Sequence, residues 1–529
     1  MSAPQQPPSP AGSSPSPAAG PLDGLVQPSQ IGVEPVTQRE LRRRATAWAM
    51  WDWGSASFNA VVTTFVFSRY IASDLFVDPA IVAAGGDGLT RALAGNASVV
   101  AWAVAIAGLL VALLAPIIGQ RSDGGGRRKL WVAVNTGLTI LAMVGMFFVT
   151  PVPEYIWLGA ALLAAGNLFF EFASVNYNAM LHQVSTKASL GRTSGYGWGM
   201  GYVGGIVLLA LLLVLFIFPI ASPDAGGVLG LPNGRDGAAL DVRLAVLASA
   251  VWFLIFALPL LLRVPELPPT GAVPARVGLI ESYRILFRTV ARIGRTAPKT
   301  LLFLVASAIF RDGLSGVFTF GAIIASSVFG FDATEVILFA IAANVTAGAG
   351  TFIGGWADDR FGPKIVIVIS LIVLSLSGLA VLFVEGKSMF WVFGLALSTF
   401  VGPVQSASRS FMARITPEGR EGEMFGLYAT TGRAVSFLAP LLFGIFVSVT
   451  GDTRFGILGI VLVLLAGLAL VLPVHPRPTV ITDDRAGAGA GTGPGAGPGA
   501  GTGAGAGTGT GTGTGADAAT GTESSPPRP

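Results

Sequence analysis

Six ionisable side chains lie within long apolar stretches, and these residues have the strongest potential for chemistry. An ionisable group inside a hydrocarbon layer is costly, so each one marks a candidate functional site. A carboxylate can hold an ammonium group or a proton, and the guanidinium fork of arginine can hold a carboxylate. A set that mixes both signs suits a zwitterionic solute, and it suits other polar solutes equally. The six residues are Asp52, Glu171, Arg311, Asp312, Arg409 and Arg433.

Amide side chains share these stretches and extend the candidate set, because they donate and accept hydrogen bonds without carrying a charge. Their presence beside acids and bases indicates a polar site enclosed by apolar segments. The residues that we predict to bind a substrate or a coupling ion are Asp52, Asn59, Glu171, Asn178, Asp312, Asn344, Gln405, Arg409 and Arg433.

Each of the three carboxylates has two interpretations. Asp52 lies about six residues into its predicted helix, where it suits an interfacial cap or gate partner as well as a binding residue. Asp312 lies about twelve residues into its helix, near the middle of a bilayer, so we favour a role in transport over an ion pair with an arginine on another helix. Glu171 is also deep, and it suits either a coupling proton or a hydrogen bond to a neighbouring helix.

The two arginines among the nine predicted binding residues also leave alternatives open. Arg409 is predicted either to bind the substrate or to close an inner gate. Arg433 lies about nine residues into its helix, where an unpaired cation is unfavourable, so it needs a carboxylate partner. Glu171 is a candidate for that partner, although nothing in the sequence pairs the two residues.

The chain lacks the residue clusters that common enzyme classes require. It contains no cysteine and only two histidines, which excludes thiol catalysis and metal sites rich in cysteine or histidine. Neither a Gly-x4-Gly-Lys-Ser/Thr phosphate loop nor a His-Glu-x-x-His motif is present. We therefore predict no enzyme, no catalytic residue, no metal, no cofactor and no nucleic-acid partner.

The elements that must position these side chains are apolar segments. The chain of 529 residues is 52% hydrophobic and 12% charged, whereas a soluble domain is about 25% charged. Twelve predicted segments are long enough to cross the hydrocarbon core of a bilayer. They cover residues 46–71, 97–118, 130–149, 155–181, 194–218, 242–262, 300–328, 333–356, 365–384, 388–415, 424–449 and 455–472.

These spans divide the chain into two halves between low-complexity ends. The Pro/Ser-rich segment 1–38 and the Ala/Gly/Thr-rich segment 475–529 are predicted to be disordered tails. Six-helix bundles are predicted at 39–263 and 300–474, with a basic linker at 264–299 between them.

The linker contains an amphipathic stretch with its arginines on one helical face. We expect a helix on the cytoplasmic membrane surface with its apolar face toward lipid, and the plainer alternative is a solvated tether. The residues of the apolar face are Leu279, Tyr283, Leu286, Val290 and Ile293.

Two charged, glycine-rich turns repeat at matching places in the two halves, one after the second span and one after the eighth. In each turn an Asp follows a Gly by four residues, another Gly comes three residues later, and a cation follows. This repeat indicates that one half copies the plan of the other, as in membrane transporters with a site between their halves. The residues are Gly119, Asp123, Gly126, Arg127 and Arg128 in the first turn, and Gly355, Asp359, Arg360, Gly362 and Lys364 in the second.

Lysine and arginine gather in the segments that hold these turns and in the linker. Because cytoplasmic loops carry an excess of cations, this pattern predicts that both termini are cytoplasmic. We expect a multi-pass integral protein of the cell membrane, in contact with the lipid bilayer.

The order of six spans, a basic linker, six further spans and a charged turn after spans 2 and 8 resembles the major facilitator superfamily. Its loop signature reads Gly, three residues, Asp, Arg, any residue, Gly, Arg, and then Arg or Lys. The first turn has Gly124 where the signature has Arg, whereas the second keeps Arg360. The resemblance implies an all-α integral membrane protein with 12 transmembrane helices in two pseudo-symmetric bundles. It also implies a role in a cytoplasmic gate, and not in substrate binding, for Asp123, Arg127, Arg128, Asp359 and Arg360.

Further motifs resemble the vacuole-effluxer branch of this superfamily, whose eukaryotic members are associated with release of amino acids from the vacuole. The motifs include Trp51-Asp52-Trp53-Gly54, Asn176-Tyr177-Asn178-Ala179, Phe310-Arg311-Asp312-Gly313 and Gly402-Pro403-Val404-Gln405. The resemblance implies a monomeric secondary active transporter of a small polar solute, amino acids first, that works by alternating access with a proton as candidate coupling ion. The alternatives are a transporter of sugars, peptides or drugs, and a membrane scaffold or sensor that transports nothing.

Overall fold

The computed structural model describes residues 25–30, 33–217, 225–267, 278–331 and 333–475. The described residues belong to one compact unit of the chain and are almost entirely helical. The segments 1–24 and 476–529, which make up most of the two predicted tails, lie outside the described residues.

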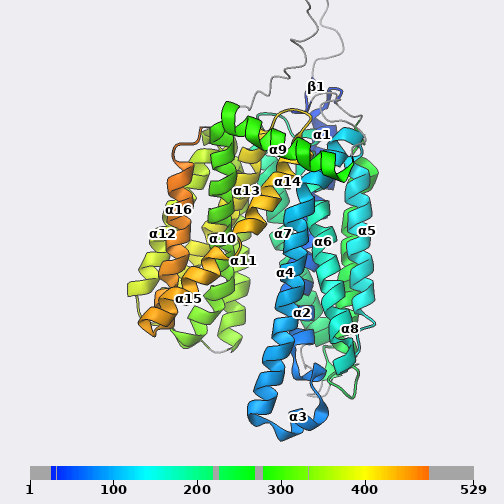
Figure 1. Ribbon diagram of the computed structural model, residues 1–529, viewed down its shortest axis with the longest axis vertical. Coiled ribbons are helices and arrows are strands. Elements are labelled where there is room, and N and C mark those ends of the chain that lie inside the picture. Colours follow the sequence, from blue (N-terminus) through cyan, green and yellow to red (C-terminus); the bar gives the residue numbers. More distant parts are fainter. Residues whose placement is uncertain (1–24, 31–32, 218–224, 268–277, 332, 476–529) are drawn as a thin grey trace, which may run out of the picture. The chain divides into compact units, whose positions relative to one another are not determined.

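The first half of the chain contributes six long helical segments (Figure 1). The first of them runs from α1 through a π-helical section, Ser57–Val66, into α2, so its backbone is not a continuous α-helix. The helices are α1 (Gln38–Ala56), α2 (Phe67–Ala72), α4 (Gly86–Gly125), α5 (Arg128–Met146), α6 (Ile156–Ala179), α7 (Leu190–Leu212) and α8 (Leu240–Arg263).

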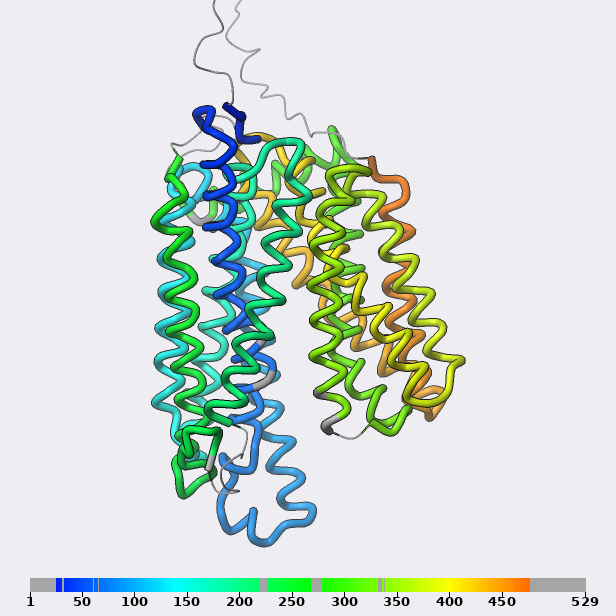
Figure 2. Tube along the Cα trace, turned by 180° about the vertical axis from the view of Figure 1, so that it is seen from behind, coloured from blue at the N-terminus to red at the C-terminus, as the bar shows by residue number. Residues whose placement is uncertain are grey.

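The second half contributes another six segments, and Figure 2 shows them beside those of the first half. Its fifth segment is broken between Val435 and Leu438, where the sequence pattern predicted one continuous span. The helices are α10 (Pro298–Ser327), α11 (Ala333–Phe361), α12 (Pro363–Phe383), α13 (Lys387–Ile415), α14 (Glu421–Val435), α15 (Leu438–Thr450) and α16 (Gly456–Val471).

Eleven helical segments of the described chain are long and apolar enough to cross a membrane. The twelfth expected span corresponds to α1 and α2 with the π-helical section between them. The protein is therefore an all-α, multi-pass membrane protein of 12 helices, as predicted. The predicted ends are less accurate, because α4 begins at Gly86 and not near residue 97.

Short elements connect these segments. They are α3 (Pro79–Ala84), α9 (Leu279–Thr296), 3-10 turns at Asp74–Phe76, Pro153–Tyr155, Met180–Gln183 and Thr453–Phe455, and the strands β1 (Leu25–Val26), β2 (Val36–Thr37), β3 (Ala225–Gly226) and β4 (Leu231–Pro232). Strand β1 pairs with β2 and β3 pairs with β4, both antiparallel.

The prediction that residues 1–38 form a disordered tail is wrong for its last part. Strands β1 and β2 form a small hairpin, and the amide of Gln27 donates to the carbonyl of Val33 at 2.8 Å. The backbone N–H of Ser29 donates to the carbonyl of Ser185 at 2.8 Å, which attaches the hairpin to the segment between α6 and α7. Hydrogen bonds from both side chains and backbone hold this segment in place, and amino-acid composition does not reveal them.

Helix α9 forms in the linker, but its apolar stripe does not face lipid as predicted. Leu286 and Ile293 are buried in the protein core, and Tyr283 and Val290 pack against that core. The Tyr283 hydroxyl also donates to the carbonyl of Leu113 on α4 at 3.0 Å. The side chain of Leu279 lies outside the described residues. The apolar stripe of α9 exists as the sequence indicated, and it packs against α4 and α10.

Candidate functional site

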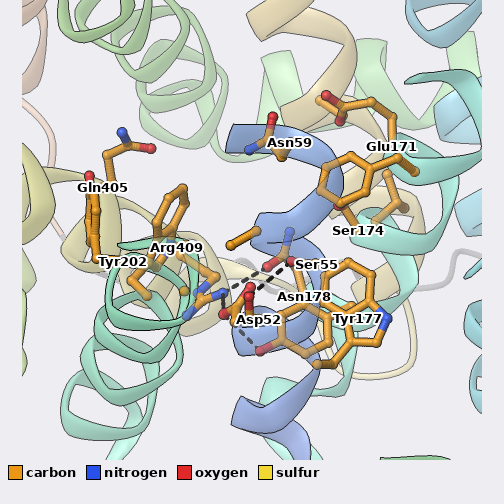
Figure 3. Close-up of a pocket in the computed structure, with 18 of the residues that line it drawn as sticks. Asp52, Ser55, Asn59, Glu171, Ser174, Tyr177, Asn178, Tyr202, Gln405 and Arg409 are labelled. Carbon is orange, nitrogen blue, oxygen red and sulfur yellow. Dashed lines mark hydrogen bonds and ion pairs between the residues drawn. The ribbon is translucent and has the colours of Figure 1, made fainter. Parts of the chain in front are cut away.

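A cavity of about 290 Å³ lies between the two halves. The first half lines it from α1, the π-helical section, α6 and α7, and the second half from α10, α11, α13 and α14. Figure 3 shows polar side chains of α1, the π-helical section, α6, α7 and α13 around one space. A polar cavity between two repeated halves is where a transporter of this plan holds its solute.

Seven of the nine predicted candidates line this cavity. They are Asp52, Asn59, Glu171, Asn178, Asn344, Gln405 and Arg409. The other two are Asp312 and Arg433, and they are not among the lining residues.

Asp52 and Arg409 join the two halves at one side of the cavity. Arg409 on α13 approaches Asp52 on α1 at 3.3 Å, and the Tyr177 hydroxyl donates to the same carboxylate oxygen at 2.8 Å. Arg409 also donates to Asn178 at 3.2 Å (Figure 3). It donates further to the side chain and carbonyl of Ser194 on α7, at 2.9 and 2.6 Å. Only 4% of the Arg409 side chain is exposed, so nearly all of its donors are used inside the protein.

Aromatic rings surround the same guanidinium. The Arg409 carbon Cζ lies 4.9 Å from the ring centre of Trp48 and 5.6 Å from that of Trp198. The ring of Trp48 stacks on that of Tyr177 with centroids 4.4 Å apart. A cation over aromatic faces is stabilised by the ring quadrupoles, most strongly where water is excluded. The arrangement therefore holds Arg409 firmly in one orientation.

Glu171 on α6 and Arg433 on α14 form a second ion pair between the halves. The sequence named Glu171 as a candidate partner for Arg433, and the structure brings the two together. The Glu171 side chain is 23% exposed and that of Arg433 is 30% exposed, so this pair is more open than the Asp52–Arg409 pair.

Asp312 lies outside the cavity lining and is buried at the break between α14 and α15. Its carboxylate accepts a hydrogen bond from the backbone N–H of Ala439 at 2.6 Å, in the first turn of α15. The first N–H groups of a helix have no partner inside that helix, so Asp312 acts as a cap supplied from α10. The alternative to a transport role for Asp312 was an ion pair with an arginine. In the structure its partner is instead a backbone N–H group.

Replacing Asp312 by alanine should therefore destabilise the protein, while Asp312→Asn should behave almost as the native chain. Alanine leaves a buried N–H of α15 without an acceptor, which costs about 1–3 kcal/mol, whereas asparagine keeps an acceptor oxygen. Thermal unfolding of the purified protein, with transport measured in parallel, checks both variants. An Asp312→Asn protein of native stability that has lost transport would restore Asp312 to the transport path.

Several lining residues were missed because they carry no charge and lie in glycine-rich or aromatic segments. Trp198, Tyr202 and Ile206 follow one another at four-residue spacing on α7, so they share one helical face. This shared face is the sequence pattern that could have indicated a cavity lining. The same pattern also occurs in helices that pack in an apolar core. Ser55, Ser174 and Tyr428 also line the cavity, and nothing in the sequence separates them from other small or aromatic residues.

The first charged turn binds the start of α14 in the other half. The Asp123 carboxylate accepts the backbone N–H groups of Gly422 at 3.0 Å and Glu423 at 2.9 Å, and it also accepts Arg128 at 2.6 Å. Arg128 in turn donates to Glu421 at 2.6 Å. All of these side chains are buried. We call this cluster of Asp123, Arg128 and Glu421 the first latch.

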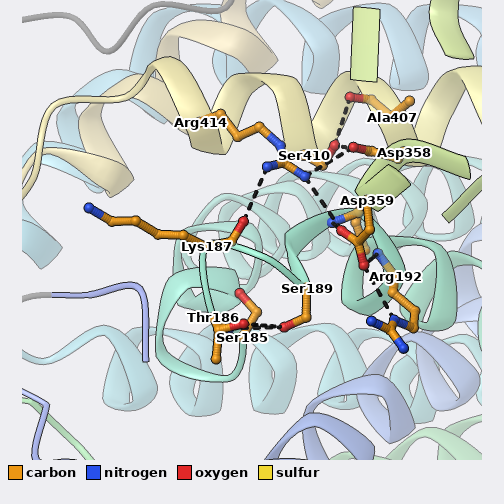
Figure 4. Close-up of polar contacts among 12 residues, drawn as sticks. Ser185, Thr186, Lys187, Ser189, Arg192, Asp358, Asp359, Ala407, Ser410 and Arg414 are labelled. Carbon is orange, nitrogen blue, oxygen red and sulfur yellow. Dashed lines mark hydrogen bonds and ion pairs between the residues drawn. The ribbon is translucent and has the colours of Figure 1, made fainter. Parts of the chain in front are cut away.

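The second charged turn binds the start of α7 in the corresponding way (Figure 4). The Asp359 carboxylate accepts the backbone N–H groups of Gly191 at 2.8 Å and Arg192 at 3.1 Å. Arg414 on α13 approaches Asp358 at 3.1 Å and Asp359 at 3.5 Å, and Ser410 donates to Asp358. We call the cluster of Asp358, Asp359 and Arg414 the second latch. The sequence missed Asp358 because it lies outside the repeated pattern.

The glycines of the turns allow the two halves to meet backbone to backbone. A Cβ atom at Gly119 would overlap the carbonyl oxygen of Gly422, and one at Gly355 would lie 2.9 Å from the carbonyl oxygen of Gly191. Gly126 and Gly362 have positive φ angles of 60° and 89°, which glycine adopts at little cost, and each ends the helix before its turn.

Among the described residues, Arg127, Arg360 and Lys364 form no ion pair between the halves like those of the two latches. Arg127 and Arg360 are exposed, and Arg360 lies 5.8 Å from the ring centre of Phe361 on its own helix. Lys364 donates to the carbonyl of Leu472 at 2.5 Å, within the second half. Because Arg360 points to the surface, the glycine at position 124 removes no contact from the first latch. Within the described residues no cluster of three acidic or histidine side chains suits a metal ion.

Comparison with solved structures shows the same fold in transporters of the major facilitator superfamily. The fucose:proton symporter FucP of E. coli aligns over 83% of this chain and 99% of its own, with a TM-score of 0.60 and 14% identity. The proton:xylose symporter XylE aligns over 82% of this chain and 95% of its own, with a TM-score of 0.61 and 12% identity.

Proteins with similar sequences include members of the same class of transporter. An uncharacterized MFS-type transporter, YxiO of Bacillus subtilis, is 24% identical over 83% of this chain and 96% of its own length. Autophagy-related protein 22 of Cryptococcus neoformans is 26% identical, but the match covers 57% of this chain and 55% of that protein, so the chain spans about half the length of this fungal relative. The family model described as "Vacuole effluxer Atg22 like" matches residues 93–477. The chain therefore belongs to the Atg22-like vacuole effluxer family, within the major facilitator superfamily of transporters.

Proposed function

We propose that this transporter moves amino acids across its membrane as a secondary active carrier, by alternating access between its two halves. The observation that carries the proposal is the cavity between the halves, in which a carboxylate, arginines and amides meet in one space. An ammonium group finds an acceptor there and a carboxylate finds donors, as a zwitterion requires. The family model, described as a vacuole effluxer, supports a role in transport and does not itself name a cargo.

The described conformation suits one stage of such a cycle. Both latches join the halves at the end of the molecule that carries the charged turns, which we call the turn end. Opening the turn end requires these contacts to break, and rocking of the two halves about the cavity would do this. We propose that the turn end faces the cytoplasm, with both termini on that side and the protein in the cell membrane, because the basic segments gather there. A single chain supplies the whole cavity and both latches, which supports a monomer as the working unit.

Counterflow in liposomes tests the proposal. Purified protein is reconstituted with an excess of unlabelled amino acids inside, and uptake of a pool of labelled amino acids is followed. We expect uptake above that of empty liposomes. Correctly folded protein that takes up no amino acid but does exchange a sugar or a peptide would refute the proposed cargo.

Glu171→Gln should separate solute exchange from proton coupling. Glutamine still accepts a hydrogen bond from Arg433 but cannot take up a proton, so a carrier that couples through Glu171 should keep counterflow and lose accumulation driven by a proton gradient. Counterflow within about threefold of native is expected, with accumulation reduced to the level seen with an uncoupler. The exposed Glu154, which precedes the same helix, provides the control Glu154→Gln. Native accumulation in Glu171→Gln would exclude Glu171 as the coupling residue.

A further inference from the structure

We propose that Arg311 is the residue that binds the carboxylate of the transported solute, an inference that rests on the proposed function. Arg311 lies on α10 in the second half, lines the cavity and is half-buried. In the part of the chain that the structure describes, no carboxylate lies within ion-pairing distance of it. Its position and its lack of an acidic partner distinguish it from the other cations near the cavity.

Those other cations are each neutralised by the protein itself. Arg409 is paired with Asp52, and Arg433 is paired with Glu171. By contrast, the polar partner of Arg311 is the backbone carbonyl of Tyr428, to which Nη1 donates at 3.2 Å. A guanidinium carries five N–H donors, so this single hydrogen bond leaves most of them available to a ligand.

Among the lining side chains, Asp52 and Glu171 are negative and Arg311 and Arg409 are positive. Asp52 is paired with Arg409, and Glu171 is paired with Arg433, which is not a lining residue, so among the described residues Arg311 is the lining charge without an ionic partner. Asp312 is adjacent in sequence, but it lies outside the lining and uses its carboxylate to cap α15. A cation without a counter-ion is unfavourable inside a membrane, and a bound carboxylate would compensate it. The unpaired charge of Arg311 therefore favours a solute that brings a negative group.

The surroundings of Arg311 hold its guanidinium in a fixed plane. Its Cζ lies 3.9 Å from the ring centre of Tyr428, and the Tyr428 hydroxyl is in turn hydrogen-bonded to Ser408 at 2.8 Å. A Cβ atom at position 432, which is glycine, would come within 3.3 Å of Nη2 of Arg311. Glycine at this position lets the backbone of α14 lie against the guanidinium and hold it in place. A preorganised arginine fork binds a planar carboxylate with two hydrogen bonds.

Ligand binding to purified protein tests this assignment without relying on transport. The probes are leucine, glutamine and lysine, the C-terminal amide of each, 4-methylpentanoate as a carboxylate without an ammonium group, and glucose as an uncharged solute. Dissociation constants are obtained from the ligand-dependent rise in the thermal unfolding midpoint. We expect the native protein to bind the carboxylate forms about 10- to 100-fold more tightly than their amides, the range for a charge-assisted hydrogen bond.

Arg311→Gln should reduce that preference to less than about threefold, and Arg311→Lys should keep part of it, because an ammonium retains the charge but not the fork. Arg454 provides the matched control. Like Arg311, it donates to a backbone carbonyl, that of Leu382 at 3.3 Å, and it lies 5.5 Å from the ring centre of Phe329, but it is not part of the cavity lining. Arg454→Gln should therefore keep the native preference.

The outcomes separate the two proposals. Equal binding of acids and amides by the native protein, or an unchanged preference in Arg311→Gln, overturns the role of Arg311 even if amino acids are transported. Binding of 4-methylpentanoate but not of amino acids, lost in Arg311→Gln, supports Arg311 and refutes the proposed cargo. If no carboxylate compound binds, the role of Arg311 is overturned. If glucose binds in that case, the proposed amino-acid cargo is refuted as well.

Discussion

Asp123→Ala is expected to shift the protein strongly away from the conformation in which the turn end is closed. Asp123 accepts two backbone N–H groups of α14 and two hydrogen bonds from Arg128, all in a buried cluster. Its removal leaves the buried N–H groups of Gly422 and Glu423 without their acceptor, which costs about 1–3 kcal/mol for each group, whereas Arg128 keeps Glu421 as a partner. Each 1.4 kcal/mol is about tenfold in an equilibrium constant, so the closed population should fall by about a hundredfold or more relative to the open one.

Distance measurements between two spin labels report this change directly. The native sequence contains no cysteine, so a pair of labelled cysteines needs no background substitutions. Arg127 and Glu418 suit the labels because both are exposed and they lie on opposite sides of the first latch. We expect a short, narrow distance distribution in otherwise native protein and a longer, broader one in Asp123→Ala.

The control for this experiment is Asp87→Ala, which removes an exposed carboxylate from the far end of the same helix, α4. Asp87→Ala should leave the distribution unchanged. If the distribution of Asp123→Ala also matched that of the native protein, the first latch would not hold the turn end closed. Combination with Asp359→Ala then shows whether the second latch is sufficient by itself.

Arg409→Gln is expected to abolish transport. The variant removes the cation that links α13 to Asp52, Ser194 and Asn178 of the first half, and it leaves Asp52 with the Tyr177 hydroxyl alone. A loss of about 3–5 kcal/mol is expected from the uncompensated buried carboxylate. Counterflow should fall at least about a hundredfold, with a lower thermal unfolding midpoint. Lysine at this position should not restore activity, since it cannot reproduce the fork.

A double-mutant cycle tests whether the effect comes from the Asp52–Arg409 pair. If it does, Asp52→Asn combined with Arg409→Gln should lose less stability than the sum of the two single losses, because the second substitution removes a charge that the first left unpaired. Strictly additive losses would count against the pair. Arg263→Gln, which changes an exposed arginine at the end of α8, serves as the surface control.

The sequence predicted the spans, the repeat and most of the cavity, because these depend on local patterns. An apolar run of about 20 residues is visible without any tertiary information. Acids, arginines and amides are rare inside such runs, so they stand out, and Asp52, Asn178 and Gln405 do line the cavity. The repeated turns were likewise visible from their spacing, and the structure places both Asp123 and Asp359 at helix starts in the opposite half.

What the sequence could not supply depends on which helices become neighbours. The role of Asp312 follows from the break before Leu438. Pro440, in the first turn of α15, is a sequence signal for that break, but it does not reveal that Asp312 caps the new helix. Arg311 was left out of the predicted binding residues, although it lines the cavity. The structure distinguishes it by pairing Arg409 and Arg433 with acids from the other half. Position along the chain carries no information about such partners, because they lie more than two hundred residues away.

The glycine contacts of the two latches have a consequence for the entropy of the closing motion. A long side chain that becomes fixed in an interface loses up to about 1.5–2 kcal/mol of rotamer freedom, whereas glycine loses none. At Gly119 and Gly422, and at Gly355 and Gly191, the halves meet through bare backbone. These four glycines lose no side-chain rotamer freedom when the turn end closes, and they regain none when it opens. The balance between the closed and open turn end is therefore set mainly by the charges and helix caps of the latches.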